Sequence, residues 1–120
     1  MLKWDVWQLS QADSRKVTDP KQPNDGTKDR RYFVIISPNP HLKTSKTAVC
    51  LPIQTVSDAS SFSVQVYGKP SPAGIPYDSY IRCTDFYTLD KGHFKTRMGH
   101  LTKSEQDNVD AAIRDFFSLY

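Results

Sequence analysis

The sequence lacks any long uninterrupted apolar run, and this excludes a protein with a membrane-spanning helix. No stretch approaches the ~20 consecutive apolar residues that a membrane-spanning helix needs. The first residues also lack the apolar segment of a secretory signal, so we expect a cytoplasmic protein. No internal repeat is present, and 120 residues is an ordinary length for one domain, which we expect to span residues 1–120.

Cysteine and histidine are also scarce, which bears on metal and redox chemistry. The two cysteines, Cys50 and Cys83, each lie in an apolar, β-rich stretch, where we expect buried free thiols. The three histidines, His41, His93 and His100, are not spaced with the cysteines or with one another as metal ligands are. We therefore expect surface histidines, no metal site and no cofactor.

Positive charge is in moderate excess and unevenly spread along the chain. The net charge is +3, with −2 on residues 102–120 and +5 on residues 1–101. A positive field over the first part is consistent with a nucleic-acid partner, although a charge of this size does not identify one. The apolar fraction of 38% and the charged fraction of 24% argue against a disordered chain.

β-branched and aromatic residues recur in short runs, which is typical of a mainly β protein. The run at residues 62–66 alternates, so that Phe62, Val64 and Val66 share one face of a half-buried strand. Pro38 stops a second, almost wholly apolar run, and a loop is expected from there through Lys46. Strands are predicted at residues 4–9, 32–37, 47–53, 62–66, 79–83 and 94–100, with a long charged loop at 10–30 and a turn region at 68–76.

The last part of the chain has the pattern of a capped amphipathic helix. Thr102 and Glu105 have the spacing of a capping box, in which each side chain accepts from the backbone N–H of the other residue. Apolar residues then follow at helical spacing on one face: Val109, Ala112, Ile113, Phe116 and Phe117. We expect a helix of ~15 residues that packs this face on a sheet.

Short motifs occur in an order that points to a known family. They are Trp4-Asp5-Val6-Trp7, the run from Arg31 to Pro38, the run from Thr47 to Ile53, the run from Cys83 to Lys91, Gly99-His100-Leu101-Thr102, and Val109-Asp110-Ala111-Ala112-Ile113. In this order they resemble the PemK/MazF toxin family, over roughly residues 30–56 and 80–118 and weakly over residues 3–9. The resemblance implies a fold that is mainly β with a C-terminal α-helix, a small SH3-like β-barrel.

The resemblance also implies a function. Active members are toxins of type II toxin–antitoxin systems and metal-independent, sequence-selective endoribonucleases that cut single-stranded RNA. The 2′-hydroxyl next to the cut attacks the phosphate and leaves a cyclic phosphate and a free 5′-hydroxyl. A homodimer and a cognate antitoxin with an acidic tail are implied as partners. The alternative is a toxin on the same fold without nuclease activity, resembling the gyrase poisons, or an inactive member that binds RNA or a partner.

A cation at the start of the second predicted strand is the first candidate catalytic group. The key arginine of the family opens that strand, and Arg31 stands in this position. A guanidinium suits the role because it stays charged and its planar fork matches two phosphate oxygens. Arg30 and Lys28, just before it, are candidates for contacts with the RNA backbone.

The end of the third predicted strand offers two candidates for a second catalytic group. The family has a threonine here, whereas this register holds Gln54, with Thr55 one residue later. A shift of one residue turns a side chain to the opposite face of a strand, so Thr55 replaces the threonine only if a bulge restores its direction. Pro52 indicates a strand end or such a bulge, and the choice between Gln54 and Thr55 stays open.

Further positions depart from the family pattern. Trp4 stands where the family has glycine, and Tyr32 where it has proline. Tyr87 replaces an arginine, and its ring either stacks on an RNA base or packs within the protein. Asp85 stands where the family often has glutamine, and is a candidate for contact with a base edge.

Overall fold

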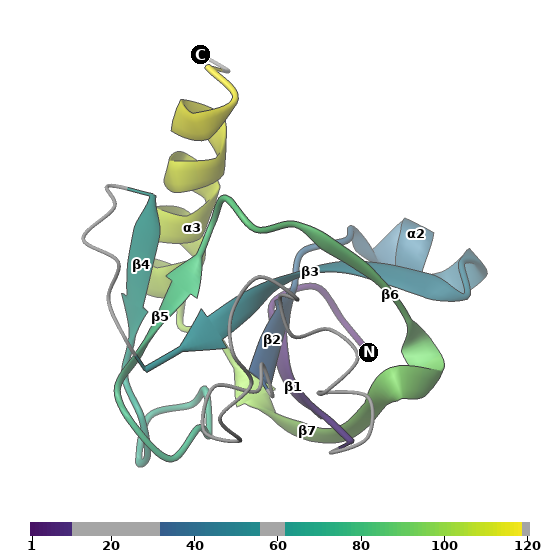
Figure 1. Cartoon of the computed structure of the whole chain (residues 1–120), viewed down its shortest axis with the longest axis horizontal. Coiled ribbons are helices and arrows are strands. Elements are labelled where there is room, and N and C mark those ends of the chain that lie inside the picture. The colour runs from purple at the N-terminus through teal and green to yellow at the C-terminus, as the bar shows by residue number, and fades with distance from the viewer. Residues whose placement is uncertain (11–31, 56–61, 119–120) are drawn as a thin grey trace, which may run out of the picture.

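One antiparallel sheet with a C-terminal helix makes up most of the described chain (Figure 1). The structure is a computed structural model that describes residues 1–10, 32–55 and 62–118. The elements are β1 (Asp5–Leu9), β2 (Tyr32–Ile35), α2 (Asn39–Thr44), β3 (Thr47–Gln54), β4 (Ser63–Val66), β5 (Ser79–Arg82), β6 (Tyr87–Asp90), the 3₁₀ turn η1 (Lys91–His93), β7 (Phe94–His100) and α3 (Lys103–Phe116). The six predicted strands are confirmed, the one at 94–100 with the predicted bounds and the other five with bounds that differ by one or two residues. The loop predicted at 10–30 lies almost wholly outside the described residues.

The strand β3 is the centre of the sheet. The strands follow the order β4-β5-β3-β2-β1-β7, and β6 pairs with β3 outside this path. The first half of β3 therefore pairs with β6 and its second half with β5, while β2 lies along its other side. In the described part of the chain the end strands β4 and β7 do not pair, so the curved sheet stays open. The fold is mainly β with a C-terminal helix, as expected, and barrel-like rather than closed.

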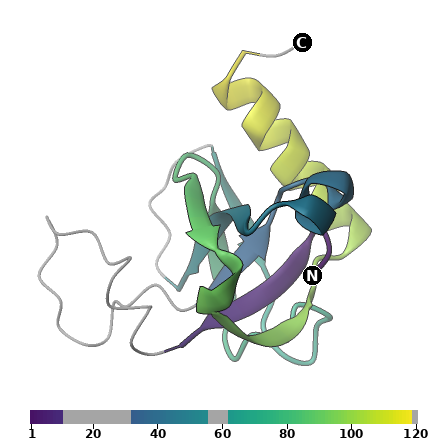
Figure 2. The same cartoon turned by 90° about the vertical axis from the view of Figure 1, so that its right-hand side faces the viewer.

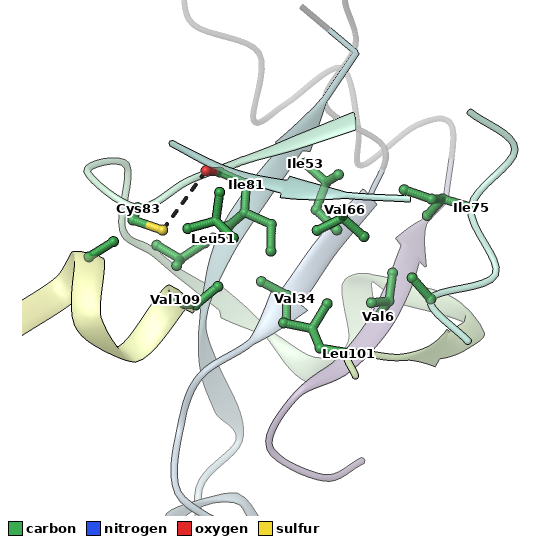
Figure 3. Close-up of a cluster of buried hydrophobic side chains, with 13 residues drawn as sticks. Val6, Val34, Leu51, Ile53, Val66, Ile75, Ile81, Cys83, Leu101 and Val109 are labelled. Atoms are coloured by element: carbon green, nitrogen blue, oxygen red, sulfur yellow. Dashed lines mark hydrogen bonds between the residues drawn. The ribbon is translucent and has the colours of Figure 1, made fainter. Parts of the chain in front are cut away.

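Apolar side chains fill both faces of this sheet. One cluster lies between the sheet and α3, and Figure 3 shows Val34, Leu51 and Val109 within it. The other covers the opposite face and includes Phe33 and Ile35. Successive residues of a strand point to opposite faces, so a strand buried on both sides reads as a continuous apolar run. Each fully buried large side chain contributes about 1.5–3 kcal/mol.

The helix α3 begins with the capping box that the sequence predicts. Thr102 Oγ1 accepts from the Glu105 N–H at 3.2 Å, and Glu105 Oε1 accepts from the Thr102 N–H at 2.8 Å. The helix has 14 residues, close to the expected length, and Val109 and Ala112 are buried against the sheet. Its C-terminal end extends beyond the sheet in both views (Figure 1, Figure 2).

The expectation of a loop after Pro38 is wrong. The predicted loop from Pro38 through Lys46 contains the short helix α2, which buries Leu42. Pro40 lies in its first turn, where a backbone N–H has no acceptor within the helix, so a proline is tolerated there. A further strand, β6, forms within the run from Cys83 to Lys91, where Tyr87–Asp90 pairs with the first half of β3.

Pro52 is neither at a strand end nor in a bulge. It is the sixth of the eight residues of β3, and the register between β2 and β3 runs from Ile35↔Cys50 to Tyr32↔Ile53 without a shift. On the other side of β3, the pairing with β6 ends at Cys50 and the pairing with β5 starts at Ile53. Pro52 lies in the gap between these two partners, and a residue without an N–H is tolerated where one side has no ladder.

The two cysteines are buried free thiols, as the sequence predicts. Cys83 lies in the cluster beneath α3, and Cys50 lies in the cluster on the opposite face. Burial removes water from the thiolate and raises the pKa of Cys83 to about 12. The same cause raises the pKa of Cys50 well above its ordinary range.

Candidate functional site

The candidate catalytic residues that the structure describes lie at the end of β3. Gln54 is the last residue of this strand and Thr55 follows it. Tyr32, the first residue of β2, pairs with Ile53, so the start of β2 lies beside the end of β3. Arg31, Arg30 and Lys28 fall outside the described residues, and their predicted roles stay predictions.

The regular ladder decides which way Gln54 points. Ile53 is buried in the core beneath α3, so the next side chain, Gln54, is directed to the opposite face, where it is partly exposed. Thr55 is exposed beyond the last paired residue. The bulge that would give Thr55 the direction of Gln54 is absent, and this part of the prediction is wrong.

Gln54 belongs to a row of polar side chains that crosses three strands. Its Cα pairs with Tyr80 of β5, which in turn pairs with Gln65 of β4. Neighbours along the strands, Val64 and Ile81, are in the core, so the row faces outward. Tyr80 and Gln65 were not singled out from the sequence, although the alternation at 62–66 already put Gln65 on the face opposite Val64 and Val66.

Asp85 is held in a local ion pair. Its Oδ2 lies 3.2 Å from Nε of Arg82, and both side chains are about one-quarter exposed. Thr84 Oγ1 is 3.2 Å from the other carboxylate oxygen. Arg82 is a cation that the sequence analysis missed, and its signal was a charged residue between the buried Ile81 and Cys83.

Tyr87 is packed within the protein and lies away from Gln54. Its ring meets Phe33 edge-on at a centroid distance of 5.5 Å. Its backbone oxygen accepts from Cys50 Sγ at 3.7 Å, and its Cα pairs with Cys50. Gln54 follows Cys50 by four positions, which is ~13 Å along a strand. The structure therefore does not bring Tyr87 together with Gln54.

The departure at Trp4 leaves the first strand in place. Trp4 has φ +75°, a left-handed conformation that glycine adopts freely and that disfavours other residues by about 1–2 kcal/mol. Its N–H donates to Ile35 O at 2.7 Å, and its own carbonyl accepts from the Leu101 N–H at 3.0 Å. The buried carboxylate of Asp5 next to it accepts from Arg97 Nη2 at 3.2 Å. These contacts and the packing of Trp4 on the core offset the strain.

The described ranges contain neither a cluster of metal-ligating side chains nor a helix that could span a membrane. Within residues 1–10, 32–55 and 62–118, no three His, Cys, Asp or Glu side chains gather as a metal site would require. Over the same ranges no helix combines the length and the apolar character needed to cross a membrane.

The fold and the sequence place the chain in one family. The sequence profile of the PemK-like, MazF-like toxins of type II toxin-antitoxin systems matches residues 15–117. The chain therefore belongs to this family. No curated protein sequence matches it.

Solved structures of toxins share the fold. An endoribonuclease from a mycobacterial species, in complex with its cognate antitoxin, is 16% identical with a TM-score of 0.73, over 100% of this chain and 97% of that chain. MazF from Deinococcus radiodurans is 9% identical with a TM-score of 0.71, over 98% and 96%. The Mycobacterium tuberculosis toxin MazF-mt6 is 20% identical with a TM-score of 0.67, over 75% and 88%. At these identities the likeness shows the fold alone.

Proposed function

We propose that this toxin is a sequence-selective endoribonuclease that arrests growth by cutting single-stranded RNA in the cytoplasm without a metal ion. Residues 1–120 act as one toxin domain. The observation that carries the proposal is the corner of the sheet where β2 starts and β3 ends. Arg31 is covalently joined to Tyr32, which pairs with Ile53 beside Gln54. Gln54 therefore lies next to the strand end that Arg31 precedes in the sequence, and a solved structure with the same fold is an endoribonuclease.

The reaction assigns a task to each group. The 2′-oxygen loses its proton and attacks the phosphorus, the bond to the 5′-oxygen breaks, and that oxygen takes up a proton. The Arg31 guanidinium stabilises the extra negative charge on the phosphorane. The Gln54 amide faces the outer side of the sheet and orients the ribose or phosphate, and Thr55 is the alternative for this task.

The remaining predicted contacts rank behind these two. Arg30 and Lys28 bind neighbouring phosphates in this proposal. Asp85 and Tyr87 are weaker candidates for base contacts, because the Asp85 carboxylate already pairs with Arg82 and the Tyr87 ring already packs on Phe33.

A cleavage assay with matched variants tests the proposal. The purified protein is incubated with a long RNA and a chelator, and the new ends are mapped. Arg31→Ala is expected to lower the cleavage rate about 10²- to 10³-fold, as removal of one preorganised group does at other sites. Gln54→Ala and Thr55→Ala are compared directly, with the exposed Thr96→Ala on β7 as the control. If the wild type cuts no RNA and its expression does not slow growth, the nuclease assignment fails.

The alternative, a toxin on this fold without nuclease activity, is favoured by one observation. The unbroken register through Pro52 leaves no threonine in the direction that the family pattern requires. A gyrase-dependent DNA-damage response with intact RNA would support a gyrase-poison-like toxin. Equal RNA affinity of the wild type and Arg31→Ala would count against any RNA site built around Arg31, catalytic or not.

We further propose that two copies associate through the phenylalanine patch, which consists of Phe62, Phe86, Phe116 and Phe117. The four rings are linked by contacts with centroid distances from 5.1 to 6.3 Å. Phe86, Phe116 and Phe117 are 36%, 40% and 52% exposed. Soluble monomers rarely leave contiguous apolar patches of this kind uncovered, and aromatic rings are enriched in protein interfaces.

The charges near the phenylalanine patch favour a second copy over RNA or an acidic peptide. Arg82 pairs with Asp85 and Arg114 pairs with Asp110, so the two cations there are matched by carboxylates. The acidic antitoxin is instead expected to bind where the excess positive charge of residues 1–101 lies. Light scattering at several concentrations tests the dimer: Phe117→Ser is expected to dissociate it, whereas the equally exposed Leu2→Ser is the control. A wild type that stays monomeric contradicts this proposal.

A further inference from the structure

A second group of exposed aromatic rings lies on the loop between β4 and β5. We name residues 67–78 the tyrosine loop. Its first residue, Tyr67, is 56% exposed, and Tyr77 near its end is 70% exposed. In Figure 1 this loop lies at the opposite end of the β4–β5 hairpin from the C-terminal end of α3. Neither tyrosine has a role in the reaction proposed above.

The backbone of the tyrosine loop holds the two tyrosines close to each other. A Cβ placed on Gly68 would lie 2.6 Å from the carbonyl carbon of Tyr77, so the two chain segments are in direct contact. The Gly68 N–H donates to Asp78 Oδ1 at 2.8 Å, and the Lys69 N–H donates to Ile75 O at 2.8 Å. The backbones of Tyr67 and Tyr77 therefore lie close to each other, where the two ends of the loop meet.

The tyrosine loop is also anchored to the body of the protein. Ala73 and Ile75 are buried in the cluster beneath α3. The His100 N–H at the end of β7 donates to Pro72 O at 3.0 Å. A side chain on an anchored loop loses less conformational entropy on binding than one on a freely moving segment. The exposed rings are thus preorganised for contact with a planar partner.

The position of the tyrosine loop connects it with the candidate catalytic corner. Val64 and Val66 of β4 are buried, whereas Gln65 and Tyr67 are exposed, so Tyr67 continues the outward-facing row of this strand. Gln65 pairs with Tyr80, and Tyr80 pairs with Gln54. A strand of RNA that leaves the end of β3 across the outer row would reach the tyrosine loop.

We propose that Tyr67 and Tyr77 stack on bases of the single-stranded RNA that flank the cleaved phosphate, an inference that rests on the nuclease function proposed above. Aromatic rings on a basic surface bind single strands because every base offers a flat face. The exposed ammonium of Lys69, on the same loop, supplies a partner for a backbone phosphate. The two tyrosines thereby extend the substrate site beyond the reacting nucleotides.

Binding to RNAs of two lengths tests the inference. Both RNAs carry a 2′-deoxy nucleotide at the mapped cleavage site, so that they bind without reacting. The short one has about four nucleotides and the long one about sixteen, the range that single-strand binding folds cover. Tyr67→Ser with Tyr77→Ser is compared with Tyr67→Phe with Tyr77→Phe, which keeps the rings, and with Leu2→Ser, which removes an equally exposed apolar side chain.

The expected result is specific to length. The double serine variant should bind the long RNA roughly 5- to 150-fold more weakly for each base that loses its stacking partner, equivalent to ~1–3 kcal/mol. It should bind the short RNA as the wild type does, and the phenylalanine variant and Leu2→Ser should match the wild type on both. With cleavable long RNA, KM should rise while kcat stays the same.

The outcomes separate this inference from the proposed function. If the wild type neither binds nor cuts RNA, the nuclease function fails. If the wild type cuts RNA and the double serine variant binds the long RNA equally well, the function stands and the inference is wrong. An equal loss on both lengths also overturns it, because the tyrosines would then act at the cleaved nucleotides rather than on their flanks.

Discussion

The two ends of the β4–β5 hairpin both expose aromatic rings, yet they hold them differently. In the phenylalanine patch the rings hold one another, through contacts such as the edge-on pair of Phe62 and Phe116 at 5.4 Å. In the tyrosine loop the backbone holds the rings in place, through the contact of Gly68 with Tyr77 and through the buried Ile75. One end is a continuous apolar surface, and the other carries single rings with polar tips.

Exposure of an aromatic ring alone does not indicate the kind of partner that it binds. A continuous apolar patch gains most when another apolar surface excludes water from it. A single tyrosine keeps its hydroxyl in water and offers a face to a planar group. We therefore assign a protein partner to the phenylalanine patch and RNA bases to the tyrosine loop. The following variants test whether the two ends are held in these two ways.

The largest effect is expected from Gly68→Ala, which tests the backbone contact in the tyrosine loop. The added methyl group would meet the backbone of Tyr77 at 2.6–2.9 Å, and backbone atoms have little room to shift. We expect a loss of about 2–3 kcal/mol in the free energy of unfolding. Gly92→Ala is the control, because its nearest neighbour is a side-chain oxygen at 3.5 Å. Equal denaturant midpoints for the two variants would show that the contact does not hold the loop.

The next effect is a dependence of the free energy of unfolding on pH, which tests whether water is excluded from the core beside the phenylalanine patch. The Cys83 N–H donates to Phe62 O at 3.2 Å, so this residue lies beside one member of the patch, and its side chain is buried in the cluster beneath α3. Burial raises the pKa of Cys83 from 9.0 to about 12, and the folded state therefore disfavours the thiolate. Its contribution to stability is complete below pH 9 and is lost as the pH rises towards 12.

Unfolding experiments at two pH values measure this contribution. Between pH 8 and pH 10 the wild type should lose about 1 kcal/mol more than Cys83→Ala, because one pKa unit corresponds to 1.36 kcal/mol. Because all other titrating groups are the same in the wild type and in Cys83→Ala, their contributions cancel when the two free energies are subtracted. If the free energy of unfolding depends on pH in the same way in the wild type and in Cys83→Ala, water reaches the Cys83 thiol.

A smaller effect is expected from Thr102→Ala, which weakens the start of the helix that carries half of the phenylalanine patch. The substitution removes the hydroxyl that accepts from the Glu105 N–H. We expect a loss of about 1 kcal/mol in the free energy of unfolding. Ser104→Ala, at an exposed position in the first turn, is the control and should be neutral. Urea unfolding followed by circular dichroism compares them, and equal midpoints would argue against the capping box.

The smallest effect is expected from the ion pair near the phenylalanine patch. Arg114 Nε lies 3.0 Å from Asp110 Oδ2, and both side chains are more than half exposed. Arg114→Ala should lower the stability by no more than about 0.5 kcal/mol, and added salt should reduce the difference. Lys103→Ala is the comparison, because its pair with Asp107 has the less favourable orientation on the helix. A loss above 1 kcal/mol for Arg114→Ala would mean that charges, and not rings, hold this end.

Much of the candidate site could not be predicted from the sequence. The resemblance left the choice between Gln54 and Thr55 open, and only the strand register through Pro52 shows which face of β3 the Gln54 side chain is on. The neighbours of Gln54 across the sheet, Tyr80 and Gln65, come from strands that the sequence predicts but cannot pair. The ion pair of Arg82 with Asp85 was missed although the two are only three positions apart, because it forms where the chain turns after β5.

Features that depend on neighbours within about one helical turn could be predicted from the sequence alone. The capping box of Thr102 and Glu105 and the alternation of buried and exposed residues in β4 follow from bonds and side chains a few residues apart. Other features became clear only from the folded chain. They are the strands that meet at Gln54, the place of a proline inside β3, and the position of four phenylalanines and two tyrosines at opposite ends of the β4–β5 hairpin. These features depend on contacts between residues far apart in the chain, and a local pattern carries no information on which distant segment will supply the partner.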